Sequence, residues 1–328
     1  MFARKITATA VLGAAVATAG IASAGELSFA NFMPSNHPYV ASTFQPFADE
    51  VAQLTDGKVT VKLYSGGELG AGPVQQYNRV VDGVADLAVS LPGYTASQFP
   101  LTLLSELPGV LKEKTGTEDI YRNLALFGRD YRRVHLVALW SNAENVLFTR
   151  DKAVHSPADL KGMKIRVPSR ATGLLVEAWG GSPVSMPVTQ IYNAMQTGVI
   201  DGAMIDGTGV NAFKLNEVSK YITTGMKTTI SPFFIIMNRD AYDGLTPAER
   251  EAIDKAGHQA ALNGLASQLK VAEAGFVSFA ATPGKEVIRL TPDQAAAFDK
   301  LSAPVTEEVV RKAGGDAQKI VDALKAGQ

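Results

Sequence analysis

The alternation of strand and helix patterns along the first hundred residues is the feature that most constrains the fold. Leu27–Phe32 predicts a first strand, and Val59, Val61 and Leu63 alternate with other residues as a second. Apolar residues at helical spacing lie between them: Phe44, Phe47, Ala48, Val51 and Leu54. A second helix over Val74–Asp82 and a third strand over Ala85–Leu91 follow. This order predicts a parallel sheet covered by helices.

The same alternation starts again further along the chain. Strands are predicted at Val134–Trp140, Lys164–Val167, Gly202–Ile205 and Pro232–Asn238, and helices at Gly173–Trp179 and Pro187–Thr197. The chain has 328 residues, of which 46% are apolar, so it can supply two cores. We therefore expect an α/β protein made of two units joined by chain crossings, not one large sheet.

The C-terminal third is expected to be helical. Thr246-Pro247-Ala248-Glu249 combines a capping box with proline at the first helical position. No proline interrupts the sequence from there to about Ala281, which predicts an unusually long helix. A helix of that length is able to span two domains and brace them. Thr291-Pro292-Asp293-Gln294 and a last stretch near Lys325 predict further helices.

The N-terminus has the pattern of a signal peptide, residues 1–24. Arg4 and Lys5 precede an almost uncharged run, Ile6–Ile21, and Ala22-Ser23-Ala24 fits the small-x-small rule for cleavage. We expect cleavage between Ala24 and Gly25 and export to the periplasm, with an uncleaved amphipathic helix as the alternative. The chain has no cysteine, so disulfides, thiolate metal sites and cysteine nucleophiles are excluded.

Catalytic and nucleic-acid-binding patterns are absent from the sequence. None of the four histidines has a second histidine at metal-ligand spacing, and no nucleophile motif occurs in a credible context. The net charge is −1, without a long basic run. We expect no enzymatic activity, no cofactor or metal, and no nucleic-acid partner. An exported two-unit α/β chain of this kind suits a small molecule bound in the cleft between the units.

One candidate for ligand recognition lies in KGMKIRVPSR, residues 161–170. Met163, Ile165 and Val167 alternate with Lys164 and Arg166, and Pro168 stops the strand. Arg166 therefore lies at the end of a strand, where a chain often turns into a cleft. Taken alone, such an arginine is more often a solvated surface charge than a ligand contact.

Three segments resemble the solute-binding subunits of tripartite ATP-independent periplasmic (TRAP) transporters. They are "GGELGAGPVQQYNRVVDGVADLAV", "DLKGMKIRVPS" and "MPVTQIYNAMQTGVIDGAM". The resemblance extends over nearly the whole chain after residue 24, and the segments follow in the same order. Each segment alone is weakly specific; the combination is fairly specific to this family.

The resemblance implies a two-lobed periplasmic binding protein of type II-like fold, with a hinge and a long helix across both lobes. Lobe I would consist of residues 25–145 and about 231–275, and lobe II would consist of residues 146–230 and about 276–328. The lobes would close around an organic acid and deliver it to the small and large membrane subunits of an ion-gradient-driven permease. In this family the arginine at the position of Arg166 binds the ligand carboxylate, for which guanidinium offers parallel donors.

The sequence departs from the family pattern at two positions. Many members, especially those that bind sugar acids, have an asparagine where Ile205 stands, and binders of larger acidic sugars carry a second arginine after the interdomain crossing. Here residues 140–145 contain no arginine. Each hydroxyl of a buried sugar acid needs a polar partner. We therefore expect an aromatic or otherwise apolar monocarboxylate, such as a benzoate or hydroxybenzoate.

Further residues are candidates for the ligand site. Apolar and aromatic side chains near the expected rim are Phe32, Tyr94, Trp140, Phe148, Met186, Met204 and Phe233, of which Phe148 and Phe233 are the most typical of core. Asp206 is expected either to accept a hydrogen bond from the ligand or to be a turn aspartate. His37, Asn145 and Arg170 are the remaining polar candidates.

Several alternatives stay open from the sequence. The ligand is alternatively a 2-oxo acid, a dicarboxylate or a sugar acid, and the receptor alternatively serves an ATP-driven importer. An exported enzyme on a two-lobed fold is the alternative from a different class. Dimerisation through the long helix is neither favoured nor excluded.

Overall fold

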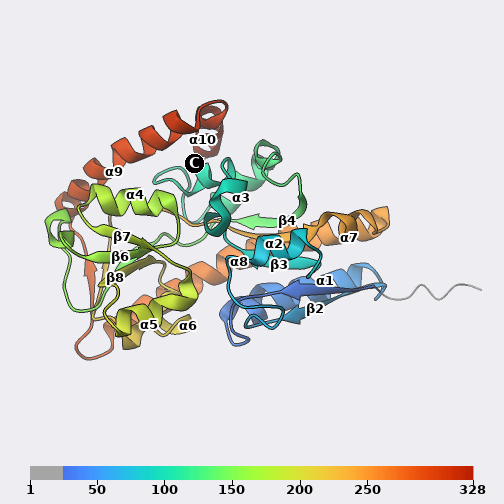
Figure 1. The fold of residues 1–328 in the computed structure, drawn as a ribbon, viewed down its shortest axis with the longest axis horizontal. Coiled ribbons are helices and arrows are strands. Elements are labelled where there is room, and N and C mark those ends of the chain that lie inside the picture. The colour runs from blue at the N-terminus through green and yellow to red at the C-terminus, as the bar shows by residue number, and fades with distance from the viewer. Residues whose placement is uncertain (1–24, 328) are drawn as a thin grey trace, which may run out of the picture.

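A computed structural model describes residues 25–327, and the predicted signal peptide lies outside them. These residues form two mixed α/β sheets that lie in separate halves of the molecule (Figure 1). The two-lobed α/β architecture expected from the sequence is confirmed. None of the helices within 25–327 is both long and apolar enough to cross a membrane.

The first sheet has the strand order β2-β1-β3-β10-β4. Its strands are β1 (Gly25–Ala30), β2 (Val59–Tyr64), β3 (Leu87–Ser90), β4 (Val134–Trp140) and β10 (Phe233–Asn238). β1 is parallel to β2 and β3, as predicted, whereas β10 is antiparallel to both of its neighbours. β10 runs the other way because the chain re-enters this sheet from the second sheet.

The second sheet has the strand order β11-β9-β5-β8-β6-β7. Its strands are β5 (Val146–Thr149), β6 (Lys164–Val167), β7 (Ser182–Ser185), β8 (Gly202–Ile205), β9 (Tyr221–Thr224) and β11 (Glu286–Arg289). The chain crosses between the sheets at residues 141–145, again at 225–232, and a third time through the long helix α8 (Pro247–Ala280). β6 and β8 were predicted with these bounds; β5, β7, β9 and β11 were not predicted.

Short helices cover the faces of both sheets. Those of the first half are η1 (Val40–Phe44), α1 (Gln45–Leu54), α2 (Gln76–Val81), η2 (Pro92–Gln98), η3 (Thr102–Glu106), α3 (Gly116–Arg122), η4 (Leu124–Phe127) and α7 (Arg239–Asp243). Those of the second half are η5 (Pro157–Leu160), α4 (Arg170–Ala178), η6 (Val188–Gln190), α5 (Ile191–Gln196), α6 (Gly209–Ala212) and η7 (Leu215–Glu217). Most are one or two turns long, so packing and not local propensity stabilises them.

The long helix α8 passes along both halves (Figure 1). Its capping box is formed as predicted, with Thr246 and Glu249 each bonding the other's backbone N–H. It packs on β4 and α1 of the first half and on α6 and β11 of the second. Because one continuous helix contacts both sheets, it limits how the halves can move relative to each other.

The central strands of both sheets, including β3, β5, β8 and β10, are buried on both faces. In β10, Phe234 and Ile236 pack into a cluster with the C-terminal helix, while Ile235 and Met237 face α1 and α8. This explains why the segment PFFIIMN is continuously apolar instead of alternating.

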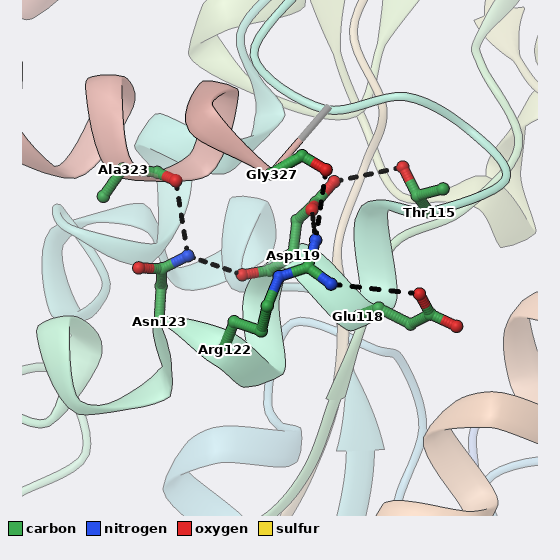
Figure 2. Close-up of polar contacts among 7 residues, drawn as sticks. All are labelled: Thr115, Glu118, Asp119, Arg122, Asn123, Ala323 and Gly327. Atoms are coloured by element: carbon green, nitrogen blue, oxygen red, sulfur yellow. Dashed lines mark hydrogen bonds and ion pairs between the residues drawn. The ribbon is translucent and has the colours of Figure 1, made fainter.

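The C-terminal helices α9 (Pro292–Ala313) and α10 (Ala317–Ala326) return the chain to the first half. Asn123 directly follows α3, and its Nδ2 atom donates to the Ala323 oxygen at 3.4 Å. Arg122 Nη2 donates to the Gly327 oxygen at 3.3 Å (Figure 2). The sequence-based division places residues 276–328 in lobe II. In the structure α10 packs on α3 and η3 because its apolar face, including Ile320 and Leu324, belongs to the first half's core.

Candidate ligand-binding site

A cavity lies between the two halves, where segments that follow the ends of several strands meet. Its lining residues are Phe32, Met33, His37, Tyr39, Leu91, Tyr94, Asn142, Asn145, Arg166, Pro168, Val188, Ile205, Asp206, Thr208, Phe213, Ser231, Phe233 and Gln268. The empty space between these residues is about 460 Å³, the open mouth included. Residues after β1, β3, β6 and β8 all contribute, because the ends of these strands face the gap between the lobes.

Arg166 is fixed at the end of β6 by three hydrogen bonds. Its side chain is buried, and Nε donates to the Met186 carbonyl and one terminal nitrogen to the Met204 carbonyl, each at 2.9 Å. The other terminal nitrogen donates to the Tyr94 hydroxyl at 3.3 Å. Since guanidinium has five N–H groups, each terminal nitrogen keeps one N–H for a further acceptor.

The charge of Arg166 has no ion-pair partner among residues 25–327. Burial lowers the pKa of Arg166, while Tyr94 and the charge of Asp206 act in the opposite direction. A guanidinium stays charged in a protein, and a buried charge without a counter-ion is costly. The arrangement is therefore preformed to accept an anion.

Tyr94 links the two halves beside Arg166. Its hydroxyl accepts hydrogen bonds from Arg166 and from the Val188 backbone N–H, the latter at 3.2 Å. The Tyr94 O–H can still donate, so the cavity offers a third donor beside the two N–H groups of Arg166. Phe32 packs edge-on against the Tyr94 ring.

A polar network borders the cavity in the loop that follows β8. Asp206 Oδ1 accepts from the Thr208 backbone N–H at 2.9 Å and from the Thr208 hydroxyl at 2.5 Å. Asp206 Oδ2 accepts from Asn142 Nδ2 at 3.1 Å. Burial raises the pKa of Asp206, and these three donors counteract that rise. Asp206 is thus both a turn aspartate and a wall of the cavity.

A second polar network lies where the chain crosses between the sheets. Asn145 Nδ2 donates to the hydroxyls of Thr229 and Ser231 at 2.9 and 3.1 Å, and Ser231 donates to Glu106 at 3.3 Å. Glu106 is buried, its Oε2 atom has no hydrogen-bond partner among residues 25–327, and the Ser169 hydroxyl of the second half lies nearby. Burial raises its pKa to about 7, and the two serine hydroxyls act against the rise.

Aromatic rings form the apolar wall. Phe233 stacks on Trp140 at 5.5 Å between ring centroids and packs edge-on against Tyr39. His37 packs between Tyr39 and Phe213, and its Nδ1 accepts from the Tyr39 backbone N–H. Because burial lowers the pKa of His37 to about 4, this histidine is neutral at pH 7. Among the residues that line the cavity, Arg166 therefore carries the positive charge.

Seven of the eleven candidates that were not interpreted as core lie together on this cavity: Phe32, His37, Tyr94, Asn145, Arg166, Ile205 and Asp206. Four do not line it, and of these Met204 contributes only its backbone carbonyl to Arg166. Trp140 is fully buried behind Phe233 and Tyr39, and Met186 contributes its backbone carbonyl to Arg166. Arg170 is exposed on α4 and lines a separate hollow, because the turn after β6 directs the start of α4 away from the cavity.

Sequence reasoning missed several lining residues. Asn142, Thr208 and Gln268 supply polar groups, and Phe233, interpreted as core, contributes a ring to the cavity. The signal for Asn142 was available, because Ser-Asn-Ala-Glu-Asn directly follows the apolar strand β4. Gln268 lies in the middle of α8 and nothing in its local sequence distinguishes it. The cavity is consequently more polar than the sequence suggested.

Comparison with protein families identifies relatives across most of the chain. The model of the family described as bacterial extracellular solute-binding protein, family 7 (DctP), matches residues 29–313. The C4-dicarboxylate-binding periplasmic protein DctP of Rhodobacter capsulatus is 24% identical over 87% of this chain and 86% of its own. A solute-binding protein of Albidiferax ferrireducens is 29% identical, and that match spans 64% of each chain.

Solved structures with the same fold include TRAP solute-binding proteins in complex with aromatic acids. One from a marine metagenome, described as specific for aromatic acid ligands and solved with 3-hydroxybenzoate, is 27% identical with a TM-score of 0.84. The alignment covers 92% of this chain and 97% of that one. One from Rhodoferax ferrireducens, solved with copurified benzoate, is 26% identical with a TM-score of 0.80 over 92% and 96% of the two chains.

Proposed function

Because the chain belongs to the bacterial extracellular solute-binding proteins of family 7, the TRAP solute receptors, we propose that its cavity binds an aromatic or otherwise apolar monocarboxylate. The carboxylate accepts hydrogen bonds from the two remaining N–H groups of Arg166 and from the Tyr94 hydroxyl. The single observation that carries this proposal is the buried guanidinium of Arg166, which has donors to spare and no ion-pair partner among the described residues.

The charges around the cavity favour one carboxylate over two. Arg166 supplies one full positive charge, and His37 adds none at pH 7 because its pKa is lowered to about 4. A second carboxylate would lie in the same cavity as the Asp206 carboxyl group, without a cation of its own. Like charges in a buried site repel strongly. This disfavours a dicarboxylate ligand.

The walls favour an apolar ligand body. The apolar residues that surround the cavity include Phe32, Leu91, Val188, Ile205, Phe213 and Phe233. A flat aromatic ring buries its faces against such side chains without leaving polar groups unpaired. A relative from Ralstonia eutropha, 26% identical, was solved with (S)-2-acetolactate, so a small oxo acid is the second candidate.

The receptor serves a membrane permease, as TRAP solute-binding proteins do. We propose that the permease has two subunits of different size. We further propose that the signal peptide is cleaved between Ala24 and Gly25. The lobes divide at residues 145, 231 and about 276, with α10 packing back on lobe I. Two genes for integral membrane subunits, without an ATPase gene, should lie beside this one; a neighbouring ATPase gene would favour an ATP-driven importer.

Thermal-shift screening tests the ligand class directly. A ligand that binds only the folded protein raises the melting temperature, by an amount that grows with its concentration relative to Kd. Benzoate, hydroxybenzoates and phenylacetate should raise it, while benzamide and benzyl alcohol, which keep the ring and lack the carboxylate, should not. Succinate and glucuronate test the dicarboxylate and sugar-acid alternatives. A rise with benzamide equal to that with benzoate would refute the carboxylate assignment.

A further inference from the structure

Asn142 is a buried residue of the cavity that the carboxylate-binding arrangement does not use. It lies in the crossing after β4, its side chain is 2% exposed, and it borders the same cavity as Arg166 and Asp206. Its Oδ1 atom is buried and has no hydrogen-bond partner within residues 25–327. Leaving a buried acceptor without a hydrogen-bond partner destabilises the folded protein. Such an atom at a cavity wall needs an explanation.

A chain of hydrogen bonds fixes which end of the carboxamide is free. Gln268 Nε2 of α8 donates to the Thr208 hydroxyl at 3.3 Å, and this hydroxyl donates in turn to Asp206 Oδ1. Asp206 Oδ2 then receives Asn142 Nδ2. Rotating the carboxamide by half a turn would set Oδ1 against a carboxylate oxygen. Because the carboxamide nitrogen donates to Asp206, the unpaired atom is the carboxamide oxygen, which is an acceptor and not a donor.

We propose that Asn142 Oδ1 accepts a hydrogen bond from a hydroxyl group of the ligand and so selects hydroxylated aromatic monocarboxylates over unsubstituted ones. The inference rests on the proposed function, since it assumes that Arg166 holds the carboxylate at another point of the same cavity. It makes Asn142 a specificity-determining residue, with Asp206, Thr208 and Gln268 as the residues that orient it. A hydroxyl at the matching ring position supplies the hydrogen bond that the buried Asn142 Oδ1 otherwise lacks.

The test is a comparison of ligand pairs by isothermal titration calorimetry. The wild-type protein is titrated with benzoate, with the three hydroxybenzoate isomers and with the three methoxybenzoates, which lack the donor. At least one hydroxybenzoate should bind about tenfold more tightly than benzoate, since meeting a buried acceptor is worth roughly that factor. Its methoxy counterpart should lose this gain. A methoxybenzoate that binds as tightly as the hydroxybenzoate, or no gain for any isomer, overturns the proposal.

Variants make the assignment to Asn142 specific. Asn142→Leu, which keeps the number of side-chain heavy atoms and removes the acceptor, should lose the hydroxyl preference, measured as the ratio of the Kd for benzoate to the Kd for the hydroxybenzoate in the same variant. Asn193→Leu, an exposed asparagine on α5, is the matched control and should keep the preference. Retention of the preference in Asn142→Leu overturns the proposal; if that variant does not fold, the wild-type hydroxy and methoxy pairs still decide.

The result separates this inference from the proposed function. If benzoate binds and the hydroxyl adds nothing, Asn142 has no role in selection and the carboxylate receptor stands. If none of the aromatic carboxylates binds, the proposed function itself fails.

Discussion

At the scale of single residues, Arg166 is held by main-chain atoms on one side and left open on the other. The carbonyls of Met186 and Met204 fix its position and neutralise none of its charge. A counter-ion from the protein would compete with the ligand carboxylate, so its absence among the described residues suits a receptor. The same reasoning explains why Asp206, which contributes charge nearby, is occupied by three donors.

Replacing Arg166 by Leu should weaken binding of a carboxylate about 100-fold or more, because a charge-assisted pair in a desolvated site is lost. Calorimetry measures the loss, and far-UV circular dichroism checks that the variant folds. Arg170→Leu is the matched control, since Arg170 is exposed and outside the cavity lining, and its affinity should equal that of the wild type. Equal losses in both variants would mean that general charge attraction, and not the geometry of Arg166, drives binding.

At the scale of elements, α8 approaches β4 so closely that side chains are excluded. A Cβ atom on Gly257 would lie 2.1 Å from the Val137 carbonyl oxygen, and one on Gly264 would lie 2.7 Å from the Trp140 indole nitrogen. Real Cβ contacts of that length do not occur, so small residues at these positions set the distance between helix and sheet. The same contact places Gln268, one turn further on, at the cavity.

Gly257→Ala should therefore destabilise the protein by about 1–3 kcal/mol, the usual cost of overpacking a core. Helix propensity alone would stabilise this variant by about 1 kcal/mol, so the sign of the change decides between the two effects. Urea denaturation measures the difference in the free energy of unfolding. Lys255→Ala, on an exposed position of the same helix, should change it by less than about 0.5 kcal/mol. A stabilised Gly257→Ala would contradict the described packing.

Elements with strong patterns could be predicted from sequence, and those stabilised by tertiary contacts could not. The bounds of β4, β6 and β8 and the capping box of α8 follow from apolar runs and local hydrogen-bonding signals. β7 (SPVS) and β9 (YITT) have no apolar run or alternation strong enough to stand out, and they form because neighbouring strands offer partners. In the site, Arg166 could be predicted from its position at the end of a strand and from the family resemblance. Gln268 could not, because only the packing of α8 across both halves brings it to the cavity.

At the scale of the whole molecule, buried groups join the two halves near the chain crossings. Tyr94 of the first half bonds Arg166 and Val188 of the second, and the Glu106 carboxyl group lies near the Ser169 hydroxyl of the second half. The described arrangement therefore has its halves in contact around the cavity. Near the crossings Glu106 is buried and Glu144 is half-buried, and desolvation raises the pKa of each to about 7.

Glu106 should make the free energy of unfolding depend on pH. Its pKa is about 7 in the folded protein and 4.5 ordinarily, so the folded state binds the extra proton between these values. The stability that Glu106 contributes is complete below pH 4.5 and is lost as pH rises to about 7.

Glu106→Gln mimics the protonated form, so it should gain about 2–3 kcal/mol over the wild type between pH 5 and pH 8. Urea denaturation at both pH values checks this. Comparing variant with wild type cancels the contributions of His37 and Glu144, which both chains share. A variant whose difference from wild type is the same at pH 5 and pH 8 would show that Glu106 does not titrate in this range.

The central claim is that Arg166 binds the carboxylate of an aromatic acid in the cavity between the lobes. A crystal structure of the protein with benzoate, or with whichever acid raises the melting temperature most, tests it most directly. We predict carboxylate oxygens at about 2.7–3.0 Å from the terminal nitrogens of Arg166, with the ring among Phe32, Phe213 and Phe233. A ligand whose carboxylate lies away from Arg166, or that occupies another site, would contradict the account.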